Sequence, residues 1–227
     1  LLVWFFLRLD QAAERKVVVD SISIPQIKAV LRLPSVWLLM VIILCAYVGY
    51  KITDVFSLYA QDVMGFDQVA SAQVGTFLLY LRPVVGILIG ILADRTQTTF
   101  WLVVGFGVMI VGALLFATGL VTATATSFFF FSILVVSTGL YAARALYYAV
   151  MERGQIPILL TGTAVGIISL VAYTPDIFAG PTMGYFLDQS PGLPGHQQVF
   201  WMLAIFGGIG AIAAGIYHRK YGKASGE

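Results

Sequence analysis

The sequence predicts an all-α membrane protein, with six transmembrane helices arranged as a 3+3 inverted-repeat bundle. Of the 227 residues, 59% are hydrophobic and only 11% are charged, which is more apolar surface than a soluble domain can bury. The apolar residues also fall in six stretches long enough to cross about 30 Å of hydrocarbon at about 1.5 Å per residue. These stretches are residues 35–60, 68–93, 99–119, 127–151, 158–187 and 197–217.

The chain opens with the apolar stretch LLVWFFLR, which is too short to cross a bilayer. We interpret residues 1–8 as the end of a preceding transmembrane helix, so an N-terminal part of the protein is expected to be missing. Residues 9–34 are polar and are predicted to form a cytoplasmic central loop. Residues 35–217 contain the six-helix transmembrane bundle, and residues 218–227 form a cytoplasmic tail.

Within the central loop, the stretch SIPQIKAVLRLP has the pattern of an amphipathic helix on the membrane surface. Pro25 suits the first turn of a helix. One face of this helix is apolar and the other is basic, formed respectively by Ile24, Ile27, Val30 and Leu31 and by Lys28 and Arg32. A plain linker is the alternative.

The basic residues predict the orientation of the chain. Ten of the 13 lysines and arginines lie on one side of the predicted spans, the other three lie inside spans, and the opposite loops contain none. Because cytoplasmic loops are enriched in basic residues, both ends of the sequence are expected to be cytoplasmic.

Ionisable side chains lie within four of the six spans and follow a repeating pattern. The third and sixth spans have none, and the others contain Lys51 and Asp54, Arg82, Arg144, and Asp176 respectively. The order charged, charged, apolar, repeated twice, is typical of two three-helix repeats in which every third helix packs outside a central cavity. A charge at the membrane centre costs roughly 2.5–3.5 kcal/mol, so these residues are candidates for function.

Two short motifs give the sequence a family resemblance. GILADRTQTT (90–99) resembles the cytoplasmic loop motif of the major facilitator superfamily, although Gln97 and Thr98 depart from it. AGPTMG (179–184) resembles the glycine–proline motif of that family. The residues of the first motif that match are Gly90, Leu92, Ala93, Asp94 and Arg95.

The resemblance covers essentially the whole chain, as the C-terminal half of a twelve-helix transporter. It implies secondary active transport with alternating access, and the missing N-terminal half, the lipid bilayer and a small-molecule substrate as partners. It implies no cofactor, no nucleic acid and no enzymatic reaction, and a bacterial inner (plasma) membrane location. It also implies that Asp94 and Arg95 form a latch that closes the inner face, although an Asp–Arg pair in a short loop is otherwise a solvated turn.

The depths of the charged residues suggest an anion site. At about 1.5 Å per residue, Arg82 lies about 16 Å and Arg144 about 13 Å from the inner boundary. Lys51, Asp54 and Asp176 lie at about 24–28 Å by the same estimate. The arginines therefore have no acid at their own depth in this chain, and the missing half or an anionic substrate is expected to supply the negative charge.

Tyrosines at helical spacing accompany these charges, and hydroxyl groups beside charges favour a pocket over simple packing. The predicted substrate-binding residues are Arg82, Arg144, Tyr141, Tyr148, Lys51 and Tyr47. Members of the family with basic residues at mid-membrane resemble the organophosphate or organic-anion and the nitrate/nitrite branches, which makes an anionic solute the expected substrate.

Asp54 and Asp176 are candidates for proton coupling. The alternative for Asp54 is a structural pair with Lys51, three residues earlier on the same helix face.

Glycines and prolines predict helix packing and kinks. Small residues at four-residue spacing let helix backbones approach closely in lipid, and proline removes a backbone donor. The residues predicted for packing or kinks are Gly86, Gly90, Pro175, Gly180, Pro181 and Gly184.

Two other functions remain open from sequence, a membrane solute sensor of the same fold and an exporter of hydrophobic drugs. A metal site is not expected, because His196 and His218 flank the last span without a cluster of further ligands.

Overall fold

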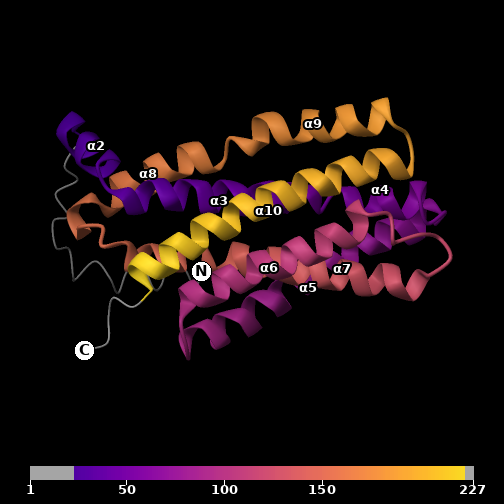
Figure 1. Ribbon diagram of the computed structural model, residues 1–227, viewed down its shortest axis with the longest axis horizontal. Coiled ribbons are helices and arrows are strands. Elements are labelled where there is room, and N and C mark those ends of the chain that lie inside the picture. Colours follow the sequence, from indigo (N-terminus) through magenta and orange to yellow (C-terminus); the bar gives the residue numbers. More distant parts are fainter. Residues whose placement is uncertain (1–22, 223–227) are drawn as a thin grey trace, which may run out of the picture.

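The computed structural model describes residues 23–222, in which every regular element is a helix and six helical stretches are long and apolar enough to cross a membrane (Figure 1). The prediction of six spans in an all-α membrane protein is confirmed. The interpretations of residues 1–8, of residues 9–22 and of the tail after Gly222 lie outside the described residues.

The observed limits of the first, second, third and fifth spans differ little from the predicted limits. The first span, Pro34–Asp62, and the fifth, Ile158–Gln189, are each divided into shorter helices. The elements are α2 (Ile24–Leu31), α3 (Pro34–Ile52), α4 (Val55–Asp62), α5 (Gln68–Asp94), α6 (Thr98–Ala117), α7 (Thr126–Leu146), α8 (Thr161–Ala172), α9 (Pro175–Gln189) and α10 (Leu193–Tyr221), with 3₁₀ helices at Ala149–Gly154 and Ile158–Leu160.

The fourth span ends earlier than predicted. Its α-helix, α7, stops at Leu146 and gives way to the 3₁₀ helix Ala149–Gly154. Tyr148 is therefore not on the face of α7 that carries Tyr141 and Arg144.

The helix predicted within the central loop is present as α2. The backbone N–H of Ser23 donates to Oε1 of Gln26 at 3.1 Å, which satisfies one of the free donors at the start of the helix. The predicted apolar face is only partly covered by the bundle, since Val30 is fully buried while Ile24 is 70% exposed.

Threonine and proline define the breaks in the divided spans. In the first span, the hydroxyl of Thr53 donates to the carbonyl of Tyr50 at 2.7 Å, just where α3 ends. In the fifth, the hydroxyl of Thr174 donates to the carbonyl of Val171 at 2.7 Å, and Pro175 begins α9. The kink predicted at Pro175 is confirmed, whereas α9 continues through Pro181.

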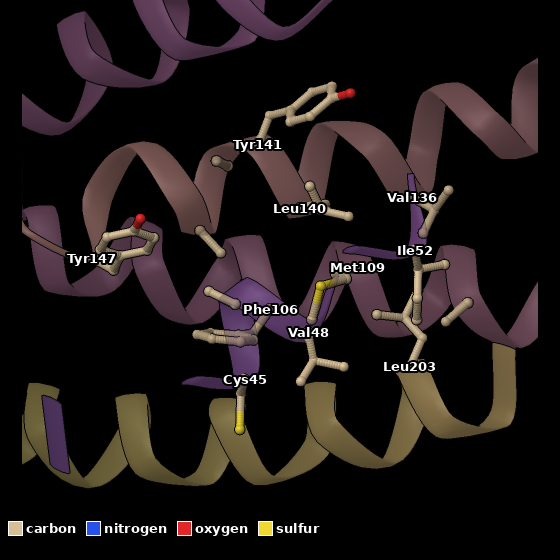
Figure 2. Packing of buried hydrophobic residues seen from close by; sticks show 14 of the residues in the cluster. Cys45, Val48, Ile52, Phe106, Met109, Val136, Leu140, Tyr141, Tyr147 and Leu203 are labelled. Atoms are coloured by element: carbon tan, nitrogen blue, oxygen red, sulfur yellow. The ribbon is translucent and has the colours of Figure 1, made fainter. Parts of the chain in front are cut away.

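Close packing is concentrated where α6 lies along α7 and α10. A Cβ atom added to Gly112 of α6 would lie 2.6 Å from the backbone nitrogen of Val136 in α7, so the two backbones touch at this glycine. Figure 2 shows Met109 of α6 beside side chains from α3, α7 and α10, where Val48, Val136 and Leu203 are fully buried.

The glycines predicted to pack do not do so within the described bundle. Cβ atoms added to Gly86, Gly90, Gly180 and Gly184 would meet nothing within 4 Å. Four-residue spacing selects small residues on one helix face, but it could not show which of these faces lie against a neighbouring helix.

The charged spans lie together on the other side of the bundle. α3 contacts α7, and α5 packs against α4 and α7. α8 and α9 pack against α3 and form the upper edge of Figure 1. The ionisable groups of α3, α5, α7 and α9 therefore come from elements that neighbour one another.

Candidate functional site

The ring of Tyr50 is close to both arginines of the predicted anion site. The guanidinium carbon of Arg144 is 3.8 Å from the centre of this ring, and that of Arg82 is 5.3 Å from it. The two carbons are therefore no farther apart than the sum of these distances, about 9 Å. An arginine over an aromatic face is attracted by the ring, and here one ring serves two cations from different helices.

The two arginines have no carboxylate partner among the described residues. Neither forms an ion pair there, and Nη1 of Arg144 is buried without a hydrogen-bond acceptor. A buried guanidinium N–H without a partner is costly, so this atom calls for an acceptor from outside the described chain.

Two pockets meet at Arg82 and Tyr141, which line both. We call the first the Asp54 pocket; it has a volume of about 270 Å³ and is lined by Tyr50, Thr53, Asp54, Ser57, Gly75, Leu78, Leu79, Arg82 and Tyr141. The second, the Arg144 pocket, has a volume of about 390 Å³ and is lined by Arg82, Pro83, Gly86, Tyr141, Arg144, Ala145 and Tyr147. Figure 2 shows the ring of Tyr141 on the side of α7 away from Met109.

Asp54 and Arg82, which were expected at different depths, share a pocket. A depth estimate placed this acid well above Arg82, yet both line the Asp54 pocket. The break between α3 and α4 falls at Thr53 and Asp54, both of which keep helical backbone dihedral angles.

The alternative in which Lys51 pairs with Asp54 is not what the structure has. Lys51 instead forms an ion pair with Asp176 of α9, with 2.7 Å between Nζ and Oδ1. The hydroxyl of Tyr47 donates to the same carboxylate, at 3.1 Å from each oxygen. This cluster links α3 to the first turn of α9, which directly follows the break in the fifth span.

Tyr148 belongs to a different group of side chains from the two pockets. Its hydroxyl is 3.2 Å from Oγ of Ser169 and 3.1 Å from the hydroxyl of Tyr173, both in the fifth span. The neighbouring Tyr147, which we did not predict, lines the Arg144 pocket instead.

The side chains predicted to form a latch are exposed at the end of α5. Asp94 is the last residue of the helix and Arg95 is its cap. No hydrogen bond or ion pair joins either side chain to another described residue.

Both histidines lie within α10 rather than beside the last span, which corrects that prediction. Nε2 of the fully buried His196 is 3.2 Å from Oδ2 of Asp62, and Nδ1 of His218 is 2.7 Å from Oγ1 of Thr99. In residues 23–222, no three His, Cys, Asp or Glu side chains come together as metal ligands.

Sequence reasoning missed Tyr50, the residue whose aromatic ring lies close to the guanidinium groups of both arginines. The pattern that could have identified it was present, because Tyr47, Tyr50, Lys51 and Asp54 follow helical spacing on one face. We selected the tyrosine one turn earlier, which contacts the guanidinium of Arg144 at a ring-centre distance of 5.5 Å.

Comparisons with known proteins give two relatives, while no family model matches the chain. The chain is 26% identical to the inner membrane protein YqcE of Escherichia coli (strain K12) over 212 residues, which are 89% of this chain and 49% of YqcE. It is 32% identical to the inner membrane protein YihN of the same organism over 74 residues, which are 33% of this chain and 18% of YihN.

The chain thus spans about half the length of YqcE. Similarity over most of its length to an inner membrane protein agrees with six helices that are long and apolar enough to cross a membrane. The chain is an integral membrane protein with an all-α fold.

Proposed function

We propose that this chain is one half of a secondary active transporter of the major facilitator superfamily, and that it moves a small anionic solute across the inner membrane. The observation that carries the proposal is the pair of arginines around Tyr50, without a carboxylate partner among the described residues. No enzymatic step is proposed.

An anion explains the arrangement of the arginines. Two guanidinium groups near one ring repel each other, and a negative group in the Arg144 pocket offsets that repulsion. The planar fork of arginine binds phosphate or carboxylate through two parallel hydrogen bonds. Such a group also supplies an acceptor for Nη1 of Arg144.

The transport cycle needs a second bundle. YqcE is about twice as long as the part that this chain matches, which leaves room for another six helices of similar size. We propose that rocking of two such bundles exposes the arginines to each side of the membrane in turn, with the basic ends of the described bundle in the cytoplasm.

Asp176 is the carboxylate through which we propose that a proton acts. Protonation removes the charge that holds Lys51 and loosens the contact between α3 and α9. The proposed proton site thus lies in the first turn of α9, next to the break in the fifth span.

The test is the variant Arg82→Lys in the intact transporter, because it keeps the charge and removes the fork. We expect substrate affinity to fall ten-fold or more, about 1.4 kcal/mol, with the fold unchanged. The control is Arg219→Lys, the same change on an exposed residue in the last turn of α10. Binding is measured by calorimetry with phosphate and carboxylate solutes.

Normal binding by Arg82→Lys, together with failure of Arg82→Ala to insert or fold, contradicts the proposal. Arg82 is then a structural residue that needs only its charge.

A further inference from the structure

Asp54 brings a negative charge into the pocket that Arg82 also lines. The side chain is exposed at the break between α3 and α4, and it forms no ion pair with a described residue. An ionised carboxylate only accepts hydrogen bonds, so donors must come to it.

The nearby cations have other partners. Lys51 pairs with Asp176, and the guanidinium of Arg82 lies over Tyr50. The hydroxyl of Thr53 lines the same pocket, but its proton is donated to the carbonyl of Tyr50 at 2.7 Å. The acceptor capacity of Asp54 is therefore free for a ligand.

The charge of Arg82 restricts which donor suits this place. An ammonium group beside Asp54 would share a pocket of about 270 Å³ with the guanidinium and would be repelled by it. A hydroxyl group donates without that penalty. Ser57, which also lines the pocket, offers a second oxygen to the same hydroxyls.

On the basis of the anion site proposed above, we infer that Asp54 is a specificity-determining residue, which accepts hydrogen bonds from hydroxyl groups of the bound solute. The acidic group of the solute lies in the Arg144 pocket, and its hydroxylated body extends past Arg82 and Tyr141 into the Asp54 pocket. The substrate class is a small hydroxylated anion rather than a bare inorganic anion or a zwitterion.

The experiment compares solutes that differ only in hydroxyl groups. Intact protein in detergent is titrated by calorimetry with gluconate and hexanoate, and with sorbitol 6-phosphate and hexyl phosphate. We expect the hydroxylated member of at least one pair to bind about ten-fold tighter, the size of one charge-assisted hydrogen bond. Asp54→Ala should reduce this ratio to about one and leave the unhydroxylated member unaffected or tighter.

Asp188→Ala is the matched control, because it removes an exposed acid at the far end of α9 and should leave the ratio unchanged. It also accounts for partition of the alkyl solutes into detergent. Should Asp54→Ala not fold, Asp54→Asn keeps the side-chain volume and should still lower the ratio several-fold.

The outcomes separate this inference from the proposed function. Equal binding within both pairs, or a ratio that Asp54→Ala and Asp54→Asn leave unchanged, overturns the role of Asp54 while the anion site stands. Tighter binding of 6-aminohexanoate than of gluconate overturns the preference for a neutral donor. If wild-type protein binds none of these acids, the anion site fails, and this inference fails with it.

Discussion

The described bundle has two sides that use glycine in opposite ways. On the closed side, where α6 meets α7 and α10, a Cβ atom at Gly112 would be 2.6 Å from a backbone atom of Val136, and one at Gly207 would be 2.9 Å from Ile110. On the open side, formed by α5 and α9, Cβ atoms at Gly86 and Gly180 would meet nothing within 4 Å.

The charges follow this division except at Arg144 of α7. On the closed side, α6 and α10 have no midmembrane charge and α7 carries Arg144, while the open side contributes Arg82 and Asp176. The absence of a side chain therefore matters for packing at Gly112 and Gly207, where a neighbouring helix lies against the glycine. The open side keeps its polar groups accessible because no described helix covers them.

The largest expected effect comes from adding a side chain at a glycine where two helix backbones touch on the closed side. Gly112→Val should lower the unfolding free energy by more than about 3 kcal/mol, the upper range for overpacking, because the neighbour at Val136 is backbone and cannot rotate away. Thermal unfolding followed by circular dichroism measures this loss. The matched control is Gly208→Val in α10, where a Cβ atom meets nothing within 4 Å.

Equal destabilisation by these two valines would contradict the division into closed and open sides. Loss of stability would then reflect the helix propensity of valine rather than backbone contact.

An intermediate effect is expected at the ring shared by the arginines. Tyr50→Leu removes a cation–π contact worth about 0.5–2 kcal/mol, so affinity for the anionic solute should fall about 2- to 30-fold. Tyr50→Phe keeps the ring and should bind nearly as well as wild type. Calorimetric titration distinguishes them, and equal loss in both would assign the effect to the hydroxyl.

The smallest change in stability is expected for Asp176→Asn. Its side chain and that of Lys51 are 48% and 31% exposed, so the thermal midpoint should move little. Uptake driven by a pH gradient should nevertheless be lost while counterflow exchange continues, because asparagine cannot release Lys51 in response to a proton. Uptake that keeps its dependence on pH would leave Asp176 as a structural link only.

Hydropathy was sufficient to predict the fold, because six spans each need an apolar stretch of fixed minimum length. It also placed Arg82 and Arg144 among the site residues, since a charge within a span is costly unless it faces other protein or a cavity. Each of these inferences requires only the sequence of a single helix.

The errors arose where two helices had to be related. The carboxylate that pairs with Lys51 lies 125 residues away in α9, and local spacing favoured Asp54 instead. Depth counting places each helix by itself and could not show that Asp54 and Arg82 line one pocket. Spacing likewise could not show that a Cβ atom added to Gly86, which lines the Arg144 pocket, would meet no atom within 4 Å.

Backbone contact at Gly112 has a mechanical consequence. Helices α6 and α7 cannot slide past each other without separating atoms that are already in contact, so they behave as one rigid piece. If the protein alternates between two conformations, as we propose, the deformation must occur outside this α6–α7 unit, in α5 and in the divided fifth span. These helices contain internal prolines, Pro83 in α5 and Pro181 in α9. The fifth span is also interrupted between α8 and α9, just ahead of Pro175.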